Sequence, residues 1–226
     1  MTALLEKIIP NVMEKLPILW ESIGQTLVMV FVSGAIALVF GLVLGVVLTV
    51  TKPGGILEHK VLYTVLDKII NLFRSIPFII LIPMIMPLSR IIVGTGIGTK
   101  GVIIPLIVGT IPFFSRQTES ALAELDGGVV EAAQAMGNSP WEIIWHVYLR
   151  ESIPGLMRAV TITFVSLVGL TAMAGAIGGG GLGDYAIRYG HQRHQTDVIY
   201  VCVILILILI TAIQSVGELI IKKTKH

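Results

Sequence analysis

Long apolar runs separated by short polar segments dominate the chain, and a helix of roughly 20 apolar residues is enough to cross a bilayer. The pattern predicts an all-α membrane protein with five transmembrane helices in a single domain, residues 1–226. The spans are expected at about residues 23–50, 69–89, 101–117, 153–177 and 198–217. A polar loop of about residues 118–152 separates the third span from the fourth.

Prolines interrupt the second expected span. Pro77, Pro83 and Pro87 each remove a backbone donor and clash with the preceding helical turn. Irregular backbone at membrane depth is tolerated where protein or a water-filled cavity covers it. This span is therefore expected to face the interior of an assembly.

The polar loop carries the signals of two short helices. Asp126 can cap the first helix, and Gly137 suits the left-handed position after its end. Ser139 can cap the second helix, with Pro140 at its first position and Glu142 completing a capping box. The loop is therefore expected to form an ordered elbow around residues 137–138.

The second helix of the elbow has an aromatic-rich pattern. Trp141, Ile144, Trp145 and Tyr148 stand at i, i+3, i+4 and i+7, which predicts one face of an α-helix. Aromatic side chains often anchor protein interfaces, so the face favours docking of a protein from the aqueous phase. The alternative is an interfacial helix that rests on the lipid headgroups.

Small residues recur every four positions along the first span. A stripe of this kind allows close approach of another helix, either in the same subunit or in a second copy. The helix-packing stripe consists of Ser33, Ala37, Gly41 and Gly45, and Thr49 continues it.

A glycine run follows the fourth span. Glycine breaks helices and tolerates positive φ, so the run can form a close-packed turn, a hinge or part of an outer gate. The candidate gate or hinge residues are Gly178, Gly179, Gly180, Gly181 and Gly183. The pattern of a phosphate-binding loop, G-x-x-x-x-G-K-[ST], is absent from the chain.

Composition excludes several classes of function. The chain is 54% hydrophobic and 13% charged, with a mean hydropathy of +0.90, values typical of a membrane protein. Its basic residues are scattered along loops, and nucleic-acid binding is therefore not expected. Cys202 lies in an apolar run and has no cysteine to pair with. His191 and His194 lack a third ligand, so no metal site is predicted. The sequence likewise predicts no cofactor and no catalytic residue.

The elbow also carries a family motif. Glu131, Ala132, Ala133 and Gly137 match the EAA-to-glycine spacing of the permease subunits of binding-protein-dependent ABC importers. Val147 and Leu149 stand where that family has an apolar I-x-L, but Arg150 replaces the usual proline. The resemblance continues through RSIPFIILIP (74–83), PFFSRQTESAL (112–122) and GAIGGGGLGDYAIRYG (175–190), and is greatest to the methionine-uptake branch.

This resemblance implies a type I ABC importer permease fold with cytoplasmic coupling helices. It implies import of methionine or a related amino acid across the bacterial plasma (inner) membrane by alternating access. The implied partners are a second copy of the chain, two cytoplasmic ABC ATPase subunits that hydrolyse the ATP, an extracytoplasmic substrate-binding (lipo)protein and membrane lipid. The residues implied in ATPase coupling are Glu131, Ala132, Ala133, Gly137, Asn138, Ser139, Pro140 and Trp141.

Orientation follows from the placement of the basic residues. With the elbow in the cytoplasm, most of the 16 Lys and Arg residues lie inside, including Lys52 and the tail residues Lys222 and Lys223. Five spans then place the N-terminus outside and the C-terminus in the cytoplasm. The first 22 residues lack the pattern of a removable signal, and we expect them to lie at the interface with Trp20 as an anchor.

Other functions remain as alternatives. A channel or secondary carrier would carry ionisable residues near the middle of its spans, and the central parts of the five expected spans lack Asp, Glu, Lys and His. A membrane-embedded hydrolase would need a nucleophile and a base within the spans, and the sequence shows neither. An ABC importer permease for a polar amino acid or a quaternary amine is the nearest alternative.

Overall fold

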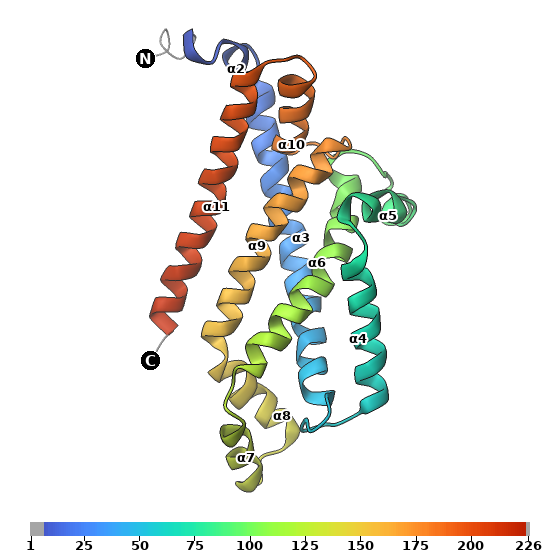
Figure 1. Ribbon diagram of the computed structural model, residues 1–226, viewed down its shortest axis with the longest axis vertical. Coiled ribbons are helices and arrows are strands. Elements are labelled where there is room, and N and C mark those ends of the chain that lie inside the picture. Colours follow the sequence, from blue (N-terminus) through green and yellow to red (C-terminus); the bar gives the residue numbers. More distant parts are fainter. Residues whose placement is uncertain (1–6, 225–226) are drawn as a thin grey trace. The chain divides into compact units, whose positions relative to one another are not determined.

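The computed structural model describes residues 7–224, and within them every regular element is helical (Figure 1). The all-α fold expected from the sequence is therefore confirmed. The elements are α2 (Pro10–Glu14), α3 (Leu16–Thr51), α4 (Lys60–Ser75), α5 (Phe78–Val93), α6 (Gly98–Ala123), α7 (Gly127–Ala135), α8 (Pro140–Glu142), the π-helix η1 (Ile143–Leu149), α9 (Ile153–Ala176), α10 (Gly181–Tyr185), the π-helix η2 (Ala186–His191) and α11 (Thr196–Thr224).

Four of the described helices are long and apolar enough to cross a membrane by themselves: α3, α6, α9 and α11. The pair α4 and α5 adds a fifth crossing if it forms one broken span. The chain leaves helical geometry at Ile76, which has a φ of −79° and a ψ of 122° and precedes Pro77. A residue before proline is pushed away from the helical region, so the expected span of about 69–89 is two helices rather than one.

Two expected boundaries lie elsewhere in the structure. Helix α6 continues beyond residue 118 to Ala123, so the polar loop begins later than the sequence suggested. Helix α3 already begins at Leu16 and therefore contains Trp20, which the sequence had placed in a separate interfacial segment. The first six residues of that expected segment lie outside the described part of the chain.

The chain divides into two compact units, and each long helix contributes a segment to both. Unit 1 comprises residues 1–35, 77–108 and 164–213. One of its cores joins α2, α10 and α11 through Val12, Tyr185 and Val198. Asn11 strengthens this arrangement by donating from its backbone N–H and its amide nitrogen to Asp197, at 3.1 and 3.0 Å. A second core of unit 1 contains Met29, Ile82, Val102, Leu106, Leu167 and Ala174.

Unit 2 comprises residues 36–76, 109–163 and 214–226, and it contains the whole elbow. Its core packs the elbow against the ends of two long helices, α3 and α6. The buried members are Val50 of α3, Leu122 of α6, Ala133 of α7, and Ile143, Ile144, Val147 and Tyr148 of η1. The elbow is therefore part of the folded core of this unit.

The small-residue stripe of α3 packs against α6 of the same chain. In unit 1, the Ser33 hydroxyl donates to the carbonyl of Ile103 at 3.4 Å. In unit 2, a Cβ added to Gly41 would lie 2.8 Å from Phe114 Cδ1, and one added to Gly45 would lie 2.7 Å from the carbonyl oxygen of Ser115. Such distances leave no room for a side chain. The sequence left the neighbour of this stripe open, and the structure identifies it as α6.

Candidate functional site

The first helix of the elbow, α7, begins and ends as the sequence predicted. The Asp126 carboxylate accepts a hydrogen bond from the Gly128 N–H at 2.9 Å and caps the helix. At the other end, Gly137 has a φ of +82°, a conformation that a side chain would disfavour. The N–H groups of Gly137 and Asn138 donate to the carbonyls of Gln134 and Ala133, which is a Schellman closure. These bonds fix the direction in which the chain leaves α7.

The second helix begins with the predicted capping box. The Glu142 N–H donates to Ser139 Oγ at 3.4 Å, and the Ser139 N–H donates back to Glu142 Oε2 at 2.7 Å. Pro140 occupies the first turn, where its missing N–H is not needed. The Ser139 side chain and backbone donors stabilise the carboxylate and lower the pKa of Glu142 from its usual value. This end of the elbow is thus held by reciprocal bonds.

The predicted single aromatic face is wrong. Trp141 and Trp145 are 70% and 62% exposed, whereas Ile144 and Tyr148 are buried in the core of unit 2. The cause is the π-helix η1, whose i→i+5 turns hold more residues than α-helical turns. Trp145, four positions after Trp141, therefore shares its face, whereas Ile144 and Tyr148, at i+3 and i+7, point to another face. The helix therefore divides its apolar residues between two faces, one anchored and one exposed.

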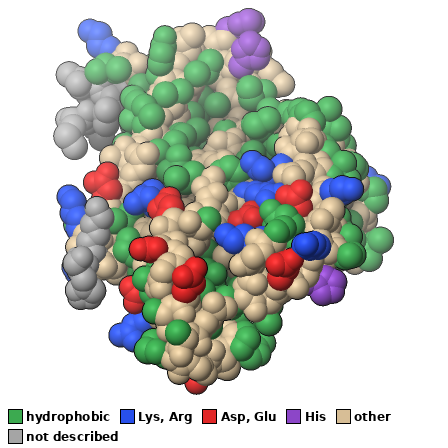
Figure 2. Space-filling model, turned by 60° about the horizontal axis from the view of Figure 1, so that its bottom comes forward, with side chains coloured by type: hydrophobic (Ala, Val, Ile, Leu, Met, Phe, Trp, Pro, Cys, Tyr) green, Lys and Arg blue, Asp and Glu red, His purple; other side chains and the backbone are tan. Residues whose placement is uncertain are grey.

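The motif residues divide in a similar way. Glu131, Ala132, Gly137, Ser139, Pro140 and Trp141 are exposed and Asn138 is half-buried, but Ala133 is buried in the core. In Figure 1, α7 and α8 lie together where α6 ends and α9 begins. Figure 2 turns that end toward the viewer and shows acidic and basic side chains gathered on it. The elbow thus offers a polar surface with exposed tryptophans.

The glycine run is a site of close backbone packing within unit 1. Gly178, Gly180 and Gly181 have φ values of +85°, +78° and +77°. The Gly181 N–H donates to Gln25 Oε1 at 2.7 Å, and the Leu182 N–H donates to Thr26 Oγ1 at 2.8 Å. A Cβ on Gly180 would come within 2.5 Å of the same Gln25 oxygen. The turn therefore depends on contact with α3.

Unit 2 contains a cluster of charged side chains that was not predicted from the sequence. Arg116 of α6 pairs with Asp67 of α4, and it donates to Glu119 Oε2 at 2.6 Å. All three side chains are at most 30% exposed. The i, i+3 spacing of Arg116 and Glu119 was visible in the sequence, but the pairing with Asp67 joins residues far apart in the chain.

Two further polar features are the histidines of residues 191–194 and an arginine of α9. Within residues 7–224, no group of three or more His, Cys, Asp or Glu side chains is placed to hold a metal ion, so His191 and His194 belong to no such group. Arg158, near the start of α9, pairs with Glu124 at 3.4 Å. It therefore has a protein partner rather than lipid headgroups alone.

Comparison with known proteins gives a consistent picture. The pattern of the family described as "Binding-protein-dependent transport system inner membrane component" matches residues 37–226. A probable D-methionine transport system permease protein MetI of Vibrio cholerae is 46% identical over 202 residues, which cover 89% of this chain and 90% of that protein. The D-methionine transport system permease protein MetI of Escherichia coli K12 is 48% identical over 162 residues, 70% of this chain and 75% of that protein.

Solved structures agree with these relatives. A chain from a structure described as "Inward facing conformations of the MetNI methionine ABC transporter" superimposes with a TM-score of 0.92. That chain is 43% identical, and the match covers 94% of this chain and 99% of the other. A chain from an amino acid ABC transporter crystallised with histidines is 15% identical with a TM-score of 0.77, which shows a shared fold only.

Proposed function

This chain belongs to the family of binding-protein-dependent transport system inner membrane components, and we propose that it is the membrane-spanning subunit of an ATP-driven methionine importer. It is a multi-pass inner-membrane permease, and ATP hydrolysis belongs to a separate subunit. The choice of methionine rests on the names of the relatives, which cover most of the chain at 43–50% identity.

The observation that carries the proposal is the anchored elbow. Its two helices meet at a Schellman turn and a capping box, and the buried face of η1 packs against α3 and α6. Trp141 and Trp145 remain exposed on the opposite face. A partner bound to the tryptophans would therefore push or pull on the core of the unit and not on a loose loop.

We assign the docking role to one ATPase subunit per elbow. Each chain has a single elbow, and two ATPase subunits require two chains, so the working unit is a homodimer around a two-fold axis. The residues that couple the chain to the ATPase are Glu131, Ala132, Ala133, Gly137, Asn138, Ser139, Pro140 and Trp141. Ala133 is buried and acts by packing α7 on the core, whereas the other residues are available to contact the partner. An extracytoplasmic binding protein delivers methionine to the opposite face.

Transport proceeds by alternating access. Closure of the ATPase subunits draws the elbows together, and the permease switches between two discrete conformations. The glycine run at residues 178–183 is the proposed outer hinge or gate, because its backbone lies directly against side chains of α3 and is bonded to them at Gln25 and Thr26. The orientation that fits this cycle has the elbow and the C-terminus in the cytoplasm and the N-terminus outside, supported by the basic tail residues.

The test is to reconstitute the purified chain with its co-purifying ATPase subunit in lipid nanodiscs. Candidate binding proteins are added with L-methionine, D-methionine, histidine or glycine betaine, and ATP hydrolysis is measured. Methionine should stimulate hydrolysis and the chain alone should hydrolyse none. ATP turnover by the chain free of the ATPase would refute the permease assignment, and stimulation by another ligand alone would refute methionine.

A further inference from the structure

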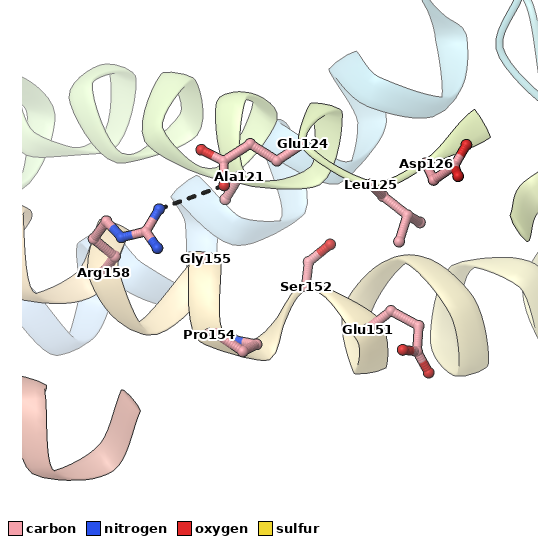
Figure 3. Close-up of a pocket in the computed structure, with 9 residues that line it drawn as sticks. All are labelled: Ala121, Glu124, Leu125, Asp126, Glu151, Ser152, Pro154, Gly155 and Arg158. Carbon is pink, nitrogen blue, oxygen red and sulfur yellow. Dashed lines mark hydrogen bonds and ion pairs between the residues drawn. The ribbon is translucent and has the colours of Figure 1, made fainter. Parts of the chain in front are cut away.

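A hollow of about 230 Å³ lies at the root of the elbow, where the loop leaves α6 and rejoins α9 (Figure 3). It lies entirely within unit 2, and it is partly open to the outside. One wall comes from the end of α6 and the turn after it, and the other from the junction of η1 with α9. The lining residues are Ala121, Glu124, Leu125, Asp126, Glu151, Ser152, Pro154, Gly155 and Arg158.

A buried hydroxyl faces into this hollow. Ser152 is 6% exposed, and its Oγ has no hydrogen-bond partner within the described part of the chain. Figure 3 shows this oxygen directed into the space between the two walls. By contrast, the hydroxyls of Thr161 and Thr163 in the following helix donate to carbonyls one turn back, each at 2.8 Å. Since buried polar groups are almost always hydrogen-bonded, the Ser152 hydroxyl, unpaired among residues 7–224, indicates that a polar group of another molecule binds in the hollow.

The charge at the rim favours a cation. Three carboxylates, Glu124, Asp126 and Glu151, line the hollow with one guanidinium, Arg158. Arg158 pairs with Glu124, which leaves the carboxylates of Asp126 and Glu151 as an excess of negative charge around the hollow. The bond that Asp126 accepts from the Gly128 N–H does not remove its charge. Among residues 7–224, the carboxylates of the hollow do not form a group of three or more His, Cys, Asp or Glu side chains placed to hold a metal ion. The fitting ligand is therefore an ammonium or guanidinium group, which donates hydrogen bonds to carboxylates and to a serine oxygen.

We propose that this hollow receives a lysine or arginine side chain of the ATPase subunit that docks on the elbow. The assignment rests on the proposed function. The hollow borders the elbow at both ends, since Asp126 caps α7 and Glu151 follows η1, so a protein seated on the elbow covers its opening. Such a side chain would link the ATPase to α6 and α9 at one point.

The preference for cations is tested on the full chain by thiol labelling. The sequence has one cysteine, Cys202, so a Cys202→Ala background with Ser152→Cys carries a single thiol in the hollow. Two methanethiosulfonate reagents are compared, one with a trimethylammonium group and one with a sulfonate group. The rate at which each reagent labels the variant is divided by the rate at which it labels a small free thiol in solution. The cationic reagent should react about tenfold faster after this correction. Glu124→Gln with Glu151→Gln should abolish the preference, and equal corrected rates in the parent would overturn the proposal.

The source of the cation is tested by adding the ATPase subunit. The thiol of the Ser152→Cys variant should become protected, while a thiol from Glu218→Cys on α11, which does not line the hollow, should stay reactive. Persistent reactivity in an assembled complex overturns this inference and leaves the importer assignment intact. Failure of the ATPase to bind overturns both. Equal protection by phosphatidylethanolamine nanodiscs without the ATPase shows a lipid headgroup instead and also overturns the proposal.

A second measurement covers the case in which the cysteine variant fails to fold. Binding of the ATPase to the chain is titrated for Glu124→Gln with Glu151→Gln, and for Glu218→Gln as a charge-matched control. The double variant should bind about tenfold more weakly with a smaller dependence on salt, because two carboxylates no longer attract the partner. Affinity equal to that of the control would contradict the proposed contact.

Discussion

The contact between α3 and α6 predicts a large difference between two alanine substitutions in one helix. Gly45 and Gly24 both lie in α3. A Cβ on Gly45 would lie 2.5 Å from Thr118 Cβ and 2.7 Å from the Ser115 carbonyl oxygen, whereas a Cβ on Gly24 would have nothing within 4 Å. Gly45→Ala should destabilise the chain, and Gly24→Ala is the matched control.

The size of the expected effect is the difference between the unfolding free energies of the two alanine variants. Both substitutions gain helix propensity, about 1 kcal/mol, so this contribution cancels between them. Overpacking of a close contact costs about 1–3 kcal/mol, and the Ser115 oxygen is backbone, which cannot swing aside as the end of a flexible side chain can. The free energy of unfolding of Gly45→Ala should therefore lie about 1–3 kcal/mol below that of Gly24→Ala.

The assay is reversible unfolding of the purified chain in mixed micelles with increasing denaturing detergent, followed by tryptophan fluorescence. The chain has three tryptophans and neither substitution removes one. Gly45→Leu, with a larger side chain, should lower the yield of folded protein while leaving membrane insertion intact. Equal unfolding free energies for the two alanine variants would refute the α3–α6 packing described above.

Further predictions concern the elbow and the charged cluster. Gly137→Val should cost about 1 kcal/mol or more at the left-handed turn and uncouple ligand-stimulated ATP hydrolysis in an assembled complex; unchanged stimulation would argue against force transmission through the elbow. Asp67→Asn should lower the unfolding free energy by about 1–3 kcal/mol through the loss of a charged partner of Arg116, and a double-mutant cycle with Arg116→Gln should show coupling. Ser139→Ala should cost about 1 kcal/mol locally, seen as faster amide exchange in the second helix. Because folding lowers the pKa of Glu142, its contribution to stability is fully present above the usual carboxyl pKa and is lost as pH falls through the lowered pKa. A carbon-13 NMR titration of the Glu142 carboxylate should therefore show a midpoint below that of a free glutamate.

Local signals in the sequence determined the elbow. The caps at Asp126 and Ser139, the turn at Gly137 and the family motif beginning at Glu131 all depend on residues within a few positions of each other. A hydrogen bond between a side chain and the backbone of the next turn needs no other part of the chain to form. The same is true of the apolar runs, because the length of a membrane-crossing helix is a property of one segment.

Only the tertiary structure decided which surfaces meet. The apolar positions of the second helix predicted one face, but the π-helical turns of η1 bury Ile144 and Tyr148 against α3 and α6 and leave the tryptophans exposed. The partner of Arg116 and the solitary hydroxyl of Ser152 could not be inferred from sequence for the same reason. Each depends on packing between segments far apart in the chain, and in a uniformly apolar sequence the pattern of hydrophobic residues does not specify which helices become neighbours.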